Sequence, residues 1–138
     1  MRMALADGGI APWAVDYINA HGTSTQLNDA CETAAVKLVF GKYAKQVMIS
    51  STKSMTGHML GAVEAIFTAL SLKDSYVPAT IHYSEPDENC DLDVVPNEGR
   101  KSRLRYAMSN SLGIGGHRRM QGSCQRGSSM YGGTDFCD

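Results

Sequence analysis

Three short apolar runs predict β-strands at 15–20, 46–50 and 105–109. Each run is rich in residues that favour strands and passes into small polar residues, which is typical of a strand that ends in a loop. Between the first two runs, apolar residues recur every three or four positions, as on one face of a helix. Alternation of strands and helices predicts an α/β fold built in layers.

The predicted helices are bounded by start and stop signals. The first ends ahead of the glycine-containing turn at 8–12. The second is expected to begin at Asp29, where the acid and Glu32 resemble a capping box, and to end at Gly41. The third, over 60–72, is apolar almost all round, which predicts a helix buried on every side.

The pattern weakens towards the end of the chain. Residues 77–81 indicate an extended edge segment, and residues 84–102 a series of loops. After residue 117 the apolar residues follow neither the helical nor the strand period. We therefore expect one domain over 1–117, followed by a divergent, poorly structured tail over 118–138.

Composition excludes several classes of function. The 138 residues are 43% apolar and 20% charged, with a formal net charge of −1, so no basic surface favours nucleic acid and no polybasic run favours a membrane. No apolar stretch approaches the ~20 residues of a membrane span. The four cysteines lack C-x-x-C spacing and no signal peptide is evident, so free thiols in the cytoplasm are expected.

Two histidines carry the chemistry that the chain offers. His21 follows the first predicted strand, and His58 follows the second together with Lys53. Loops at strand ends are where α/β folds place catalytic groups. Two imidazoles and one ammonium can hold a developing negative charge. No nucleophile is evident beside them.

Each of these residues also has a structural interpretation. A histidine at a strand end or helix entry can serve only to stabilise the fold, and a lysine can be solvated. The position of His58 before the apolar helix favours a neutral imidazole. Glu64 is the lone carboxylate within that helix, and burying it unpaired would be costly. Glu64 therefore either pairs with Lys53 or points to solvent.

Three runs, in order, resemble the β-ketoacyl-[acyl-carrier-protein] synthases of the elongating type used in bacterial fatty acid synthesis. They are 21–25 (His-Gly-Thr-Ser-Thr), 51–58 (Ser-Thr-Lys-Ser-Met-Thr-Gly-His) and 110–116 (Asn-Ser-Leu-Gly-Ile-Gly-Gly). Residues 77–81 and 91–98 look like segments of the same family. The resemblance implies a thiolase-like layered fold with a mixed sheet and packed helices, of which this chain forms most of the C-terminal half-repeat.

The resemblance implies a decarboxylative Claisen condensation, in which a malonyl-thioester carbanion attacks an acyl group held on a cysteine. It matches His21 and His58 to the histidines that stabilise the enolate. It matches Lys53 and Glu64 to the residues that organise the family's active site. The family's cysteine lies in the first half, outside this chain. The chain by itself is therefore expected to be an inactive part of an acyltransferase.

The resemblance also implies how the substrates are held. Thr23 and Thr25 match hydroxyls that bind the phosphopantetheine arm of acyl carrier protein, although a loop-capping role is a nearly equal interpretation. The backbone N–H of Ile114 matches an oxyanion-hole donor, and Gly113 and Gly115 allow close approach of the backbone. No metal, nicotinamide or other cofactor is implied.

The expected partners are acyl carrier protein and a separately encoded N-terminal half. A family-like homodimer is not expected, because that interface is built largely from the first half. The histidines and cysteines lack zinc-ligand spacing, and His82 and His117 match no catalytic position.

The chain departs from the family pattern at three places. About three residues are missing between His58 and Glu64, and removing three from a helix turns one end by about 300° and shortens it by about 4.5 Å. Leu112 and Ile114 replace phenylalanines, the second of which gates the nucleophile. From residue 118 the family's last strand gives way to unrelated sequence, as a reading-frame shift would produce, and this would leave a sheet edge open.

The sequence thus predicts the enolate-holding part of a β-ketoacyl-[acyl-carrier-protein] synthase of fatty acid synthesis. Two alternatives remain open. The first is a non-catalytic fragment, which either pairs with a separate first half or has no activity. The second is a segment of a polyketide ketosynthase.

Overall fold

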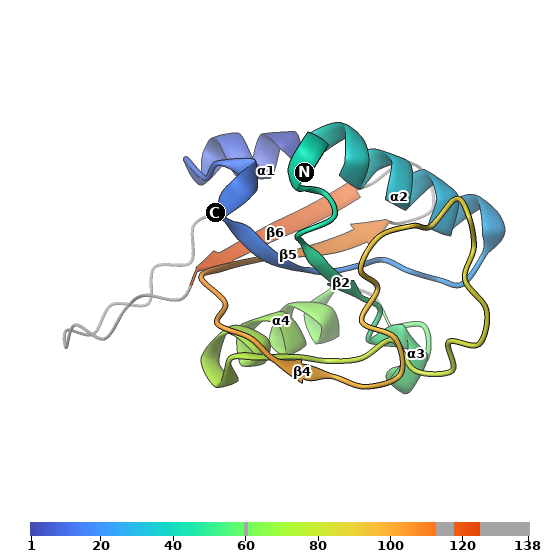
Figure 1. Cartoon of the computed structure of the whole chain (residues 1–138). Coiled ribbons are helices and arrows are strands. Elements are labelled where there is room, and N and C mark those ends of the chain that lie inside the picture. The colour runs from blue at the N-terminus through green and yellow to red at the C-terminus, as the bar shows by residue number, and fades with distance from the viewer. Residues whose placement is uncertain (60, 113–117, 125–138) are drawn as a thin grey trace.

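The computed structural model describes residues 1–59, 61–112 and the backbone of 118–124 (Figure 1). Its helices are α1 (Arg2–Asp7), α2 (Gln26–Phe40), α3 (Lys53–Thr56) and α4 (Ala62–Asp74), with the 3-10 turns η1 (Pro12–Ala14) and η2 (Gly41–Tyr43). Its strands are β1 (Val15–Asn19), β2 (Met48–Ser50), β3 (Tyr76–Val77), β4 (Arg100–Lys101), β5 (Tyr106–Leu112) and β6 (Arg118–Cys124).

A mixed sheet with the strand order β2-β1-β5-β6 forms the middle layer. β1 runs parallel to both β2 and β5, whereas β6 is antiparallel to β5. The carboxyl ends of the three parallel strands therefore meet at one edge of the sheet, where open α/β sheets bind ligands. β3 and β4 form a separate two-stranded ribbon.

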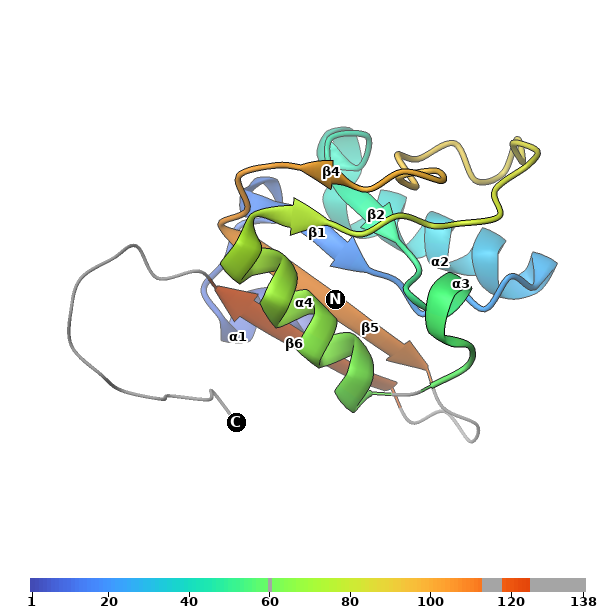
Figure 2. The ribbon, with the colours of Figure 1, turned by 90° about the horizontal axis from the view of Figure 1, so that it is seen from below.

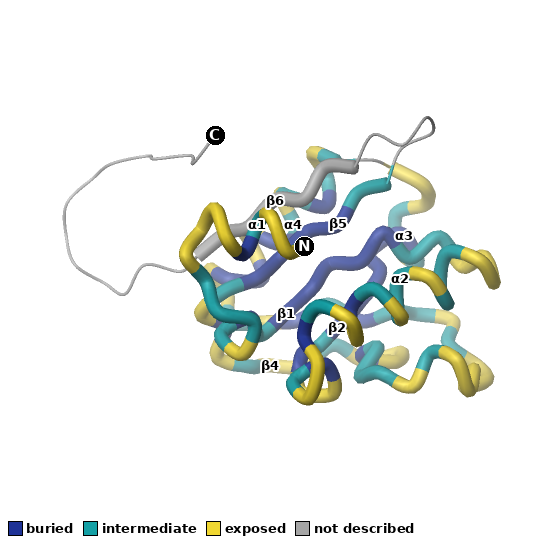
Figure 3. The backbone as a smooth tube through the Cα atoms, turned by 90° about the horizontal axis from the view of Figure 1, so that it is seen from above, coloured by how far each residue is buried: buried dark blue, intermediate teal, exposed yellow. Residues whose placement is uncertain are grey.

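Helices cover both faces of the sheet, with α1 and α2 on one side and α3 and α4 on the other (Figures 1 and 2). Each face has its own core. Ile18 of β1 packs in the cluster with Val36 and Phe40 of α2, while Tyr17 packs in the cluster with Leu72 of α4. Neighbouring residues of β1 thus point to opposite layers, as the pleat of a strand requires. β1, β2 and β5 consequently form a largely buried stripe in Figure 3.

The predicted strands are confirmed with shifted ends. β1 and β2 lie within the expected runs, and β5 extends to Leu112. The predicted start of α2 is wrong. The helix begins at Gln26, because Thr25 takes the capping position and its side chain accepts from the backbone N–H of Asn28 at 3.3 Å.

The prediction that the third helix is buried on every side is also wrong. α4 starts at Ala62, and its fully buried residues include the polar Glu64, Thr68 and Ser71. Ile66 and Leu70 are instead 58% and 43% exposed. The apolar composition of α4 is typical of a core helix. The ion pair between Glu64 and Lys53 nevertheless determines which face of α4 points inward.

The expectation of a poorly structured segment from residue 118 is wrong for its first seven residues. β6 pairs in continuous register with β5, from Leu112 opposite Arg118 to Tyr106 opposite Cys124. The edge of β5 is therefore occupied and not open. Residues 125–138 lie outside the described residues. None of the helices in the described part of the chain has the length and apolar character of a membrane span.

Candidate active site

His21 lies directly after β1, in a turn that is held from two sides. Gly22 has a φ of +39°, and a Cβ at this position would lie 2.6 Å from the Cβ of Ser51. Ser51 donates from Oγ to the carbonyl of Gly22 at 2.6 Å. The turn after β1 is thereby fastened to the turn after β2, and only glycine fits between them.

Glu32 of α2 holds the same turn from the other side. Its carboxylate accepts the backbone N–H groups of His21 and Gly22, each at 2.9 Å, and the Nδ2 of Asn110 at 3.0 Å. Hydrogen bonds to a charged acceptor are among the stronger ones in proteins. Glu32 therefore links α2, the His21 turn and β5.

The hydrogen bonds of His21 assign its tautomer. Nδ1 accepts the backbone N–H of Leu112 at 3.3 Å, so a neutral ring carries its proton on Nε2. His21 is 6% exposed, and this burial lowers the pKa of its ring below 6.5. The positive charge of Lys53 lowers the pKa of His21 further, against the opposing effect of Glu32. His21 is thus held as a neutral donor through Nε2.

His58 places a second imidazole beside the first. The two ring centroids are 5.7 Å apart and the rings meet edge to face at 72°. His58 is exposed and lies in the connection between α3 and α4, where Gly57 and Gly61 have φ values of +77° and +76°. The positive φ of Gly61 turns the chain sharply into α4, directly after the histidine.

Lys53 and Glu64 form the buried ion pair that the sequence allowed as one of two outcomes. Nζ of Lys53 lies 2.5 Å from Oε1 of Glu64, with side-chain exposures of 5% and 2%. Among the described residues, neither group has a further hydrogen-bond partner. Glu64 lies in the first turn of α4, so the short connection after His58 still directs it towards Lys53.

The two threonines predicted to bind pantetheine lie at the start of α2. Their hydroxyl oxygens are 3.3 Å apart, and the hydroxyl of Thr25 also caps the helix. The capping interpretation therefore holds for Thr25. Thr23 is partly buried and lines the pocket described next, so its role towards substrate stays a prediction.

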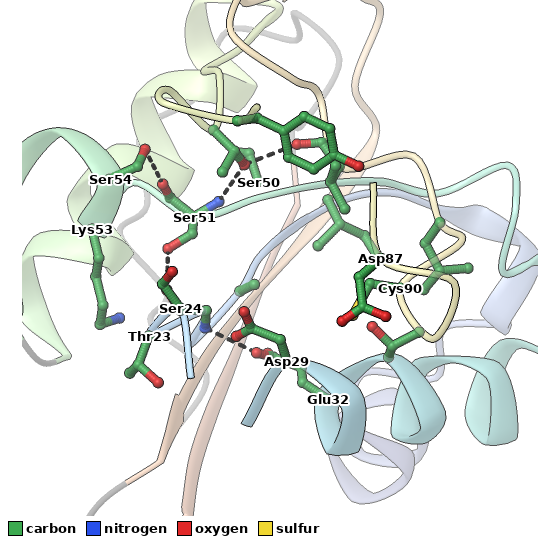
Figure 4. A pocket seen from close by; sticks show the side chains of 18 of the residues that line it. Thr23, Ser24, Asp29, Glu32, Ser50, Ser51, Lys53, Ser54, Asp87 and Cys90 are labelled. Atoms are coloured by element: carbon green, nitrogen blue, oxygen red, sulfur yellow. Dashed lines mark hydrogen bonds between the residues drawn. The ribbon is translucent and has the colours of Figure 1, made fainter. Parts of the chain in front are cut away.

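A pocket of about 590 Å³ opens beside these groups, within the usual size of small-molecule sites. Lys53, His58 and Thr23 line it, and His21 lies between its lining residues Ala20 and Gly22. In Figure 4, Lys53 and Thr23 lie on one side of the pocket, across from Asp87 and Cys90. Cys90 comes from the loop between β3 and β4 and not from the strand ends that hold the histidines.

Several predicted groups cannot be placed. Ile114, Gly113 and Gly115, expected to form the oxyanion hole, lie outside the described residues, as does His117. His82 lies at the rim of the pocket and is exposed. The described residues contain no group of three or more His, Cys, Asp or Glu side chains able to hold a metal ion.

Sequence reasoning missed the role of Glu32, which it interpreted as part of a helix-capping pattern. The carboxylate points away from the helix end and towards the His21 turn. The spacing between Thr25 and Glu32 gave a signal for this role. A helix that begins after Thr25 places residue 32 two turns inside, where an acidic side chain next to a histidine turn has no capping role.

The assembled groups have the chemistry to stabilise an oxyanion. His21 offers an N–H from Nε2, His58 presents a second imidazole next to it, and Lys53 adds a buried positive charge. Preorganised hydrogen-bond donors of this kind stabilise the negative charge that develops on oxygen during acyl transfer or enolate formation. Fold and site together indicate a protein of the acyl-transferring, condensing class.

Comparison with known proteins agrees with this class. The sequence model of the beta-ketoacyl synthase C-terminal domain matches residues 1–84, and the chain belongs to this family. It is 58% identical over 120 residues to 3-oxoacyl-[acyl-carrier-protein] synthase 2 of Staphylococcus aureus (strain COL), covering 85% of this chain and 29% of that protein. It is 53% identical over 119 residues to the synthase of the same name from Coxiella burnetii. That match covers 84% of this chain and 29% of the Coxiella protein.

Solved structures give the same fold. A ketosynthase in complex with its type II polyketide acyl-carrier protein matches with a TM-score of 0.81 and 44% identity, covering 83% of this chain and 29% of that chain. The thiolase-like layered fold implied by the sequence is thereby confirmed. The chain spans about three tenths of the length of the relatives it matches.

Proposed function

We propose that this chain is the enolate-stabilising part of a 3-oxoacyl-[acyl-carrier-protein] synthase that acts in fatty acid synthesis in the cytoplasm. The observation that carries the proposal is the pair of imidazoles, 5.7 Å apart, at the carboxyl edge of the parallel sheet. The 58% identity to a synthase of this name supports the choice of reaction.

The proposed reaction proceeds in two steps. The malonyl thioester loses CO2, and the electron pair of the broken C–C bond moves onto the thioester to form an enolate. N–H groups of His21 and His58 donate to the enolate oxygen, as oxyanion stabilisation requires. The enolate carbon then attacks the carbonyl of an acyl thioester, a new C–C bond forms, and a thiolate leaves.

Lys53 and Glu64 position the histidines in this account. Burial, and after it the ammonium of Lys53, lowers the pKa of His21 and so favours the neutral ring, in which Nδ1 accepts from Leu112 and Nε2 carries the donor proton. The carboxylate of Glu64 compensates the buried charge of Lys53. Thr23, with Thr25 at the helix start, would contact the phosphopantetheine arm of acyl carrier protein.

The chain by itself is proposed to be inactive. Of the cysteines in the described part, Cys31 is exposed on α2 and Cys90 lies across the pocket from Lys53. Neither stands beside the histidine pair as an acyl-accepting thiolate would. Acylation is therefore assigned to the part of the synthase that this chain does not span.

A polyketide ketosynthase segment is the second candidate, and the similarity to a ketosynthase bound to a polyketide carrier protein favours it. One experiment separates the candidates. The chain would replace its matching region in the Staphylococcus aureus synthase, and this chimera would receive malonyl- and acyl-carrier protein. One round of extension of saturated acyl groups supports fatty acid synthesis. Extension of 3-oxoacyl primers only would support the polyketide alternative, and product from the isolated chain would contradict its proposed inactivity.

A further inference from the structure

The outer edge of β2 is bound by residues that lie far along the chain. β2 is an edge strand of the described sheet, and such strands leave a row of backbone N–H and C=O groups open. The N–H of Ile49 donates to the backbone carbonyl of Asp93 at 2.8 Å. The N–H of Ser51, by contrast, donates to the side-chain oxygen of Thr80 at 3.1 Å. A hydroxyl thus takes the place of a neighbouring strand at the point where β2 ends.

The hydroxyl of Thr80 uses both of its hydrogen-bonding capacities. It accepts from the backbone N–H of Ser51 and donates to the carbonyl of Val94 at 2.8 Å. The backbone of Thr80 is fixed as well. Its N–H donates to the carbonyl of Val95 at 2.9 Å, and its carbonyl accepts from the N–H of Asn97 at 2.8 Å. The oxygen is therefore held in place, with a lone pair directed at the first residue after β2.

The residue after Thr80 holds the other end of the same turn. The backbone N–H of Ile81 donates to the Oγ of Ser54 at 3.0 Å, and this hydroxyl donates to the carbonyl of Ser51 at 2.7 Å (Figure 4). Two successive residues therefore contact both ends of the turn 51–54, which contains Lys53. The side chain of Lys53 is only 5% exposed, so the direction of its ammonium depends on where this turn holds the backbone.

The same turn also reaches the first histidine. The Oγ of Ser51 donates to the carbonyl of Gly22 at 2.6 Å, and a Cβ on Gly22 would lie 2.6 Å from the Cβ of Ser51. Because the two turns are in such close contact, a shift of Ser51 must also move the turn after β1. Two hydrogen bonds, through Ser51, thus connect Thr80 to the residue next to His21.

We propose that Thr80 is a positioning residue of the candidate active site, whose hydroxyl sets the places of Lys53 and His21 by holding Ser51. The hydrogen bonds alone carry this role, whereas its effect on enolate formation rests on the proposed function. Small displacements of catalytic groups cost much of their effect on a transition state. The competing interpretation is a hydroxyl that only stabilises the fold, which would affect unfolding and leave the histidine undisturbed.

Isosteric substitutions separate these interpretations. Thr80→Val removes the hydroxyl and keeps the shape of the side chain, while Thr80→Ser keeps the hydroxyl. The matched control is Thr68→Val, because the hydroxyl of Thr68 is also buried but donates to the carbonyl of Glu64 within α4, at 2.7 Å. Nitrogen NMR of the His21 ring in the isolated chain reports the tautomer and surroundings of the imidazole without relying on activity. Circular dichroism would verify that each variant is folded.

The ring signals of His21 are expected to move in Thr80→Val and to stay in place in Thr80→Ser and Thr68→Val. In the chimera with the Staphylococcus aureus synthase, Thr80→Val should lower kcat for CO2 release from malonyl-carrier protein by about tenfold, with KM changed less than about twofold. Thr80→Ser should restore kcat. Unmoved ring signals in folded Thr80→Val, whatever its stability, would overturn the positioning role.

A second variant covers the case in which Thr80→Val does not fold. Ser54→Ala removes the contact with Ile81, and unchanged ring signals and CO2 release in that variant would overturn the proposal. CO2 release lowered equally by Thr68→Val would also overturn it, in favour of a general loss of stability. Moved ring signals, together with an unsubstituted chimera that acylates its nucleophile but releases no CO2, would support the positioning role and reject the proposed function.

Discussion

The backbone N–H of Leu112, the last residue of β5, donates to Nδ1 of His21 at 3.3 Å. This contact joins the ends of two parallel strands through a side chain and decides which ring nitrogen carries the proton. With Nδ1 occupied as an acceptor, His21 can serve as a neutral donor only through Nε2. The fold therefore sets the tautomer that the proposed enolate stabilisation requires.

The stability of the chain is expected to fall as the pH is lowered below 6.5. The pKa of His21 is below 6.5 in the folded state and ordinary in the unfolded state, so between these values the unfolded chain binds more protons. Stability from this group is complete above pH 6.5 and is lost as the pH falls through the folded pKa. Urea unfolding between pH 8 and pH 5, for the wild type and His21→Gln, measures the effect. Equal pH dependence in the two proteins would contradict it.

Glu32→Gln is expected to destabilise the chain by about 1–3 kcal/mol, because a partly buried, charged hydrogen-bond acceptor shared by three donors is weakened. The matched control is Glu88→Gln, which changes the same atoms at an exposed position. Urea unfolding gives the free energies. NMR shifts of the His21 ring would also move in Glu32→Gln only. A loss of stability no larger than in the control would show that Glu32 does not hold the turn.

Glu64→Leu is expected to cost about 3–5 kcal/mol, because it leaves the ammonium of Lys53 buried without its partner. Lys53→Met should cost a similar amount for the converse reason. The double variant removes both charges and should recover much of the loss, which a double-mutant cycle on unfolding free energies would detect. Unchanged stability in Glu64→Leu, or additive losses in the double variant, would exclude the ion pair as a structural element.

Gly22→Ala should destabilise the chain more than Gly9→Ala does. Both glycines have positive φ, +39° and +59°, so alanine is strained at either position. Only at Gly22 does the added Cβ meet an atom, the Cβ of Ser51 at 2.6 Å, while nothing lies within 4 Å of it at Gly9. Thermal unfolding of the two variants isolates the steric effect. Equal losses would mean that the His21 turn is not tightly packed on Ser51.

Local patterns were sufficient to predict the strands and the positions of the histidines. β1, β2 and β5 are short, strongly apolar and followed by small polar residues, so each could be recognised separately. Because parallel strands align their carboxyl ends, two histidines that follow such strands could be expected to meet. The ion pair was predictable as one of two outcomes, since a lone carboxylate in an apolar helix either finds a positive partner or points to solvent.

One error concerns a local contact, and the others concern contacts between distant residues. The start of α2 depends on the hydroxyl of Thr25, which accepts the backbone N–H of Asn28 three residues further on, so this cap is a local feature of the sequence. The inward face of α4 was set by Glu64 and not by its apolar residues, because an unpaired buried charge outweighs the exposure of a few apolar side chains. β6 has no strand-like sequence pattern, yet its backbone pairs with the whole of β5.

The most direct test of the account is the decarboxylation of malonyl-carrier protein by the chimera, measured as CO2 release, in the unchanged form and with His21→Ala or His58→Ala. Acyl transfer to the nucleophile, measured separately by mass spectrometry, reports that the site is still assembled. Either substitution is expected to lower CO2 release by about 100-fold or more, while acyl transfer persists. Undiminished CO2 release from both variants would contradict the claim that these two imidazoles hold the enolate.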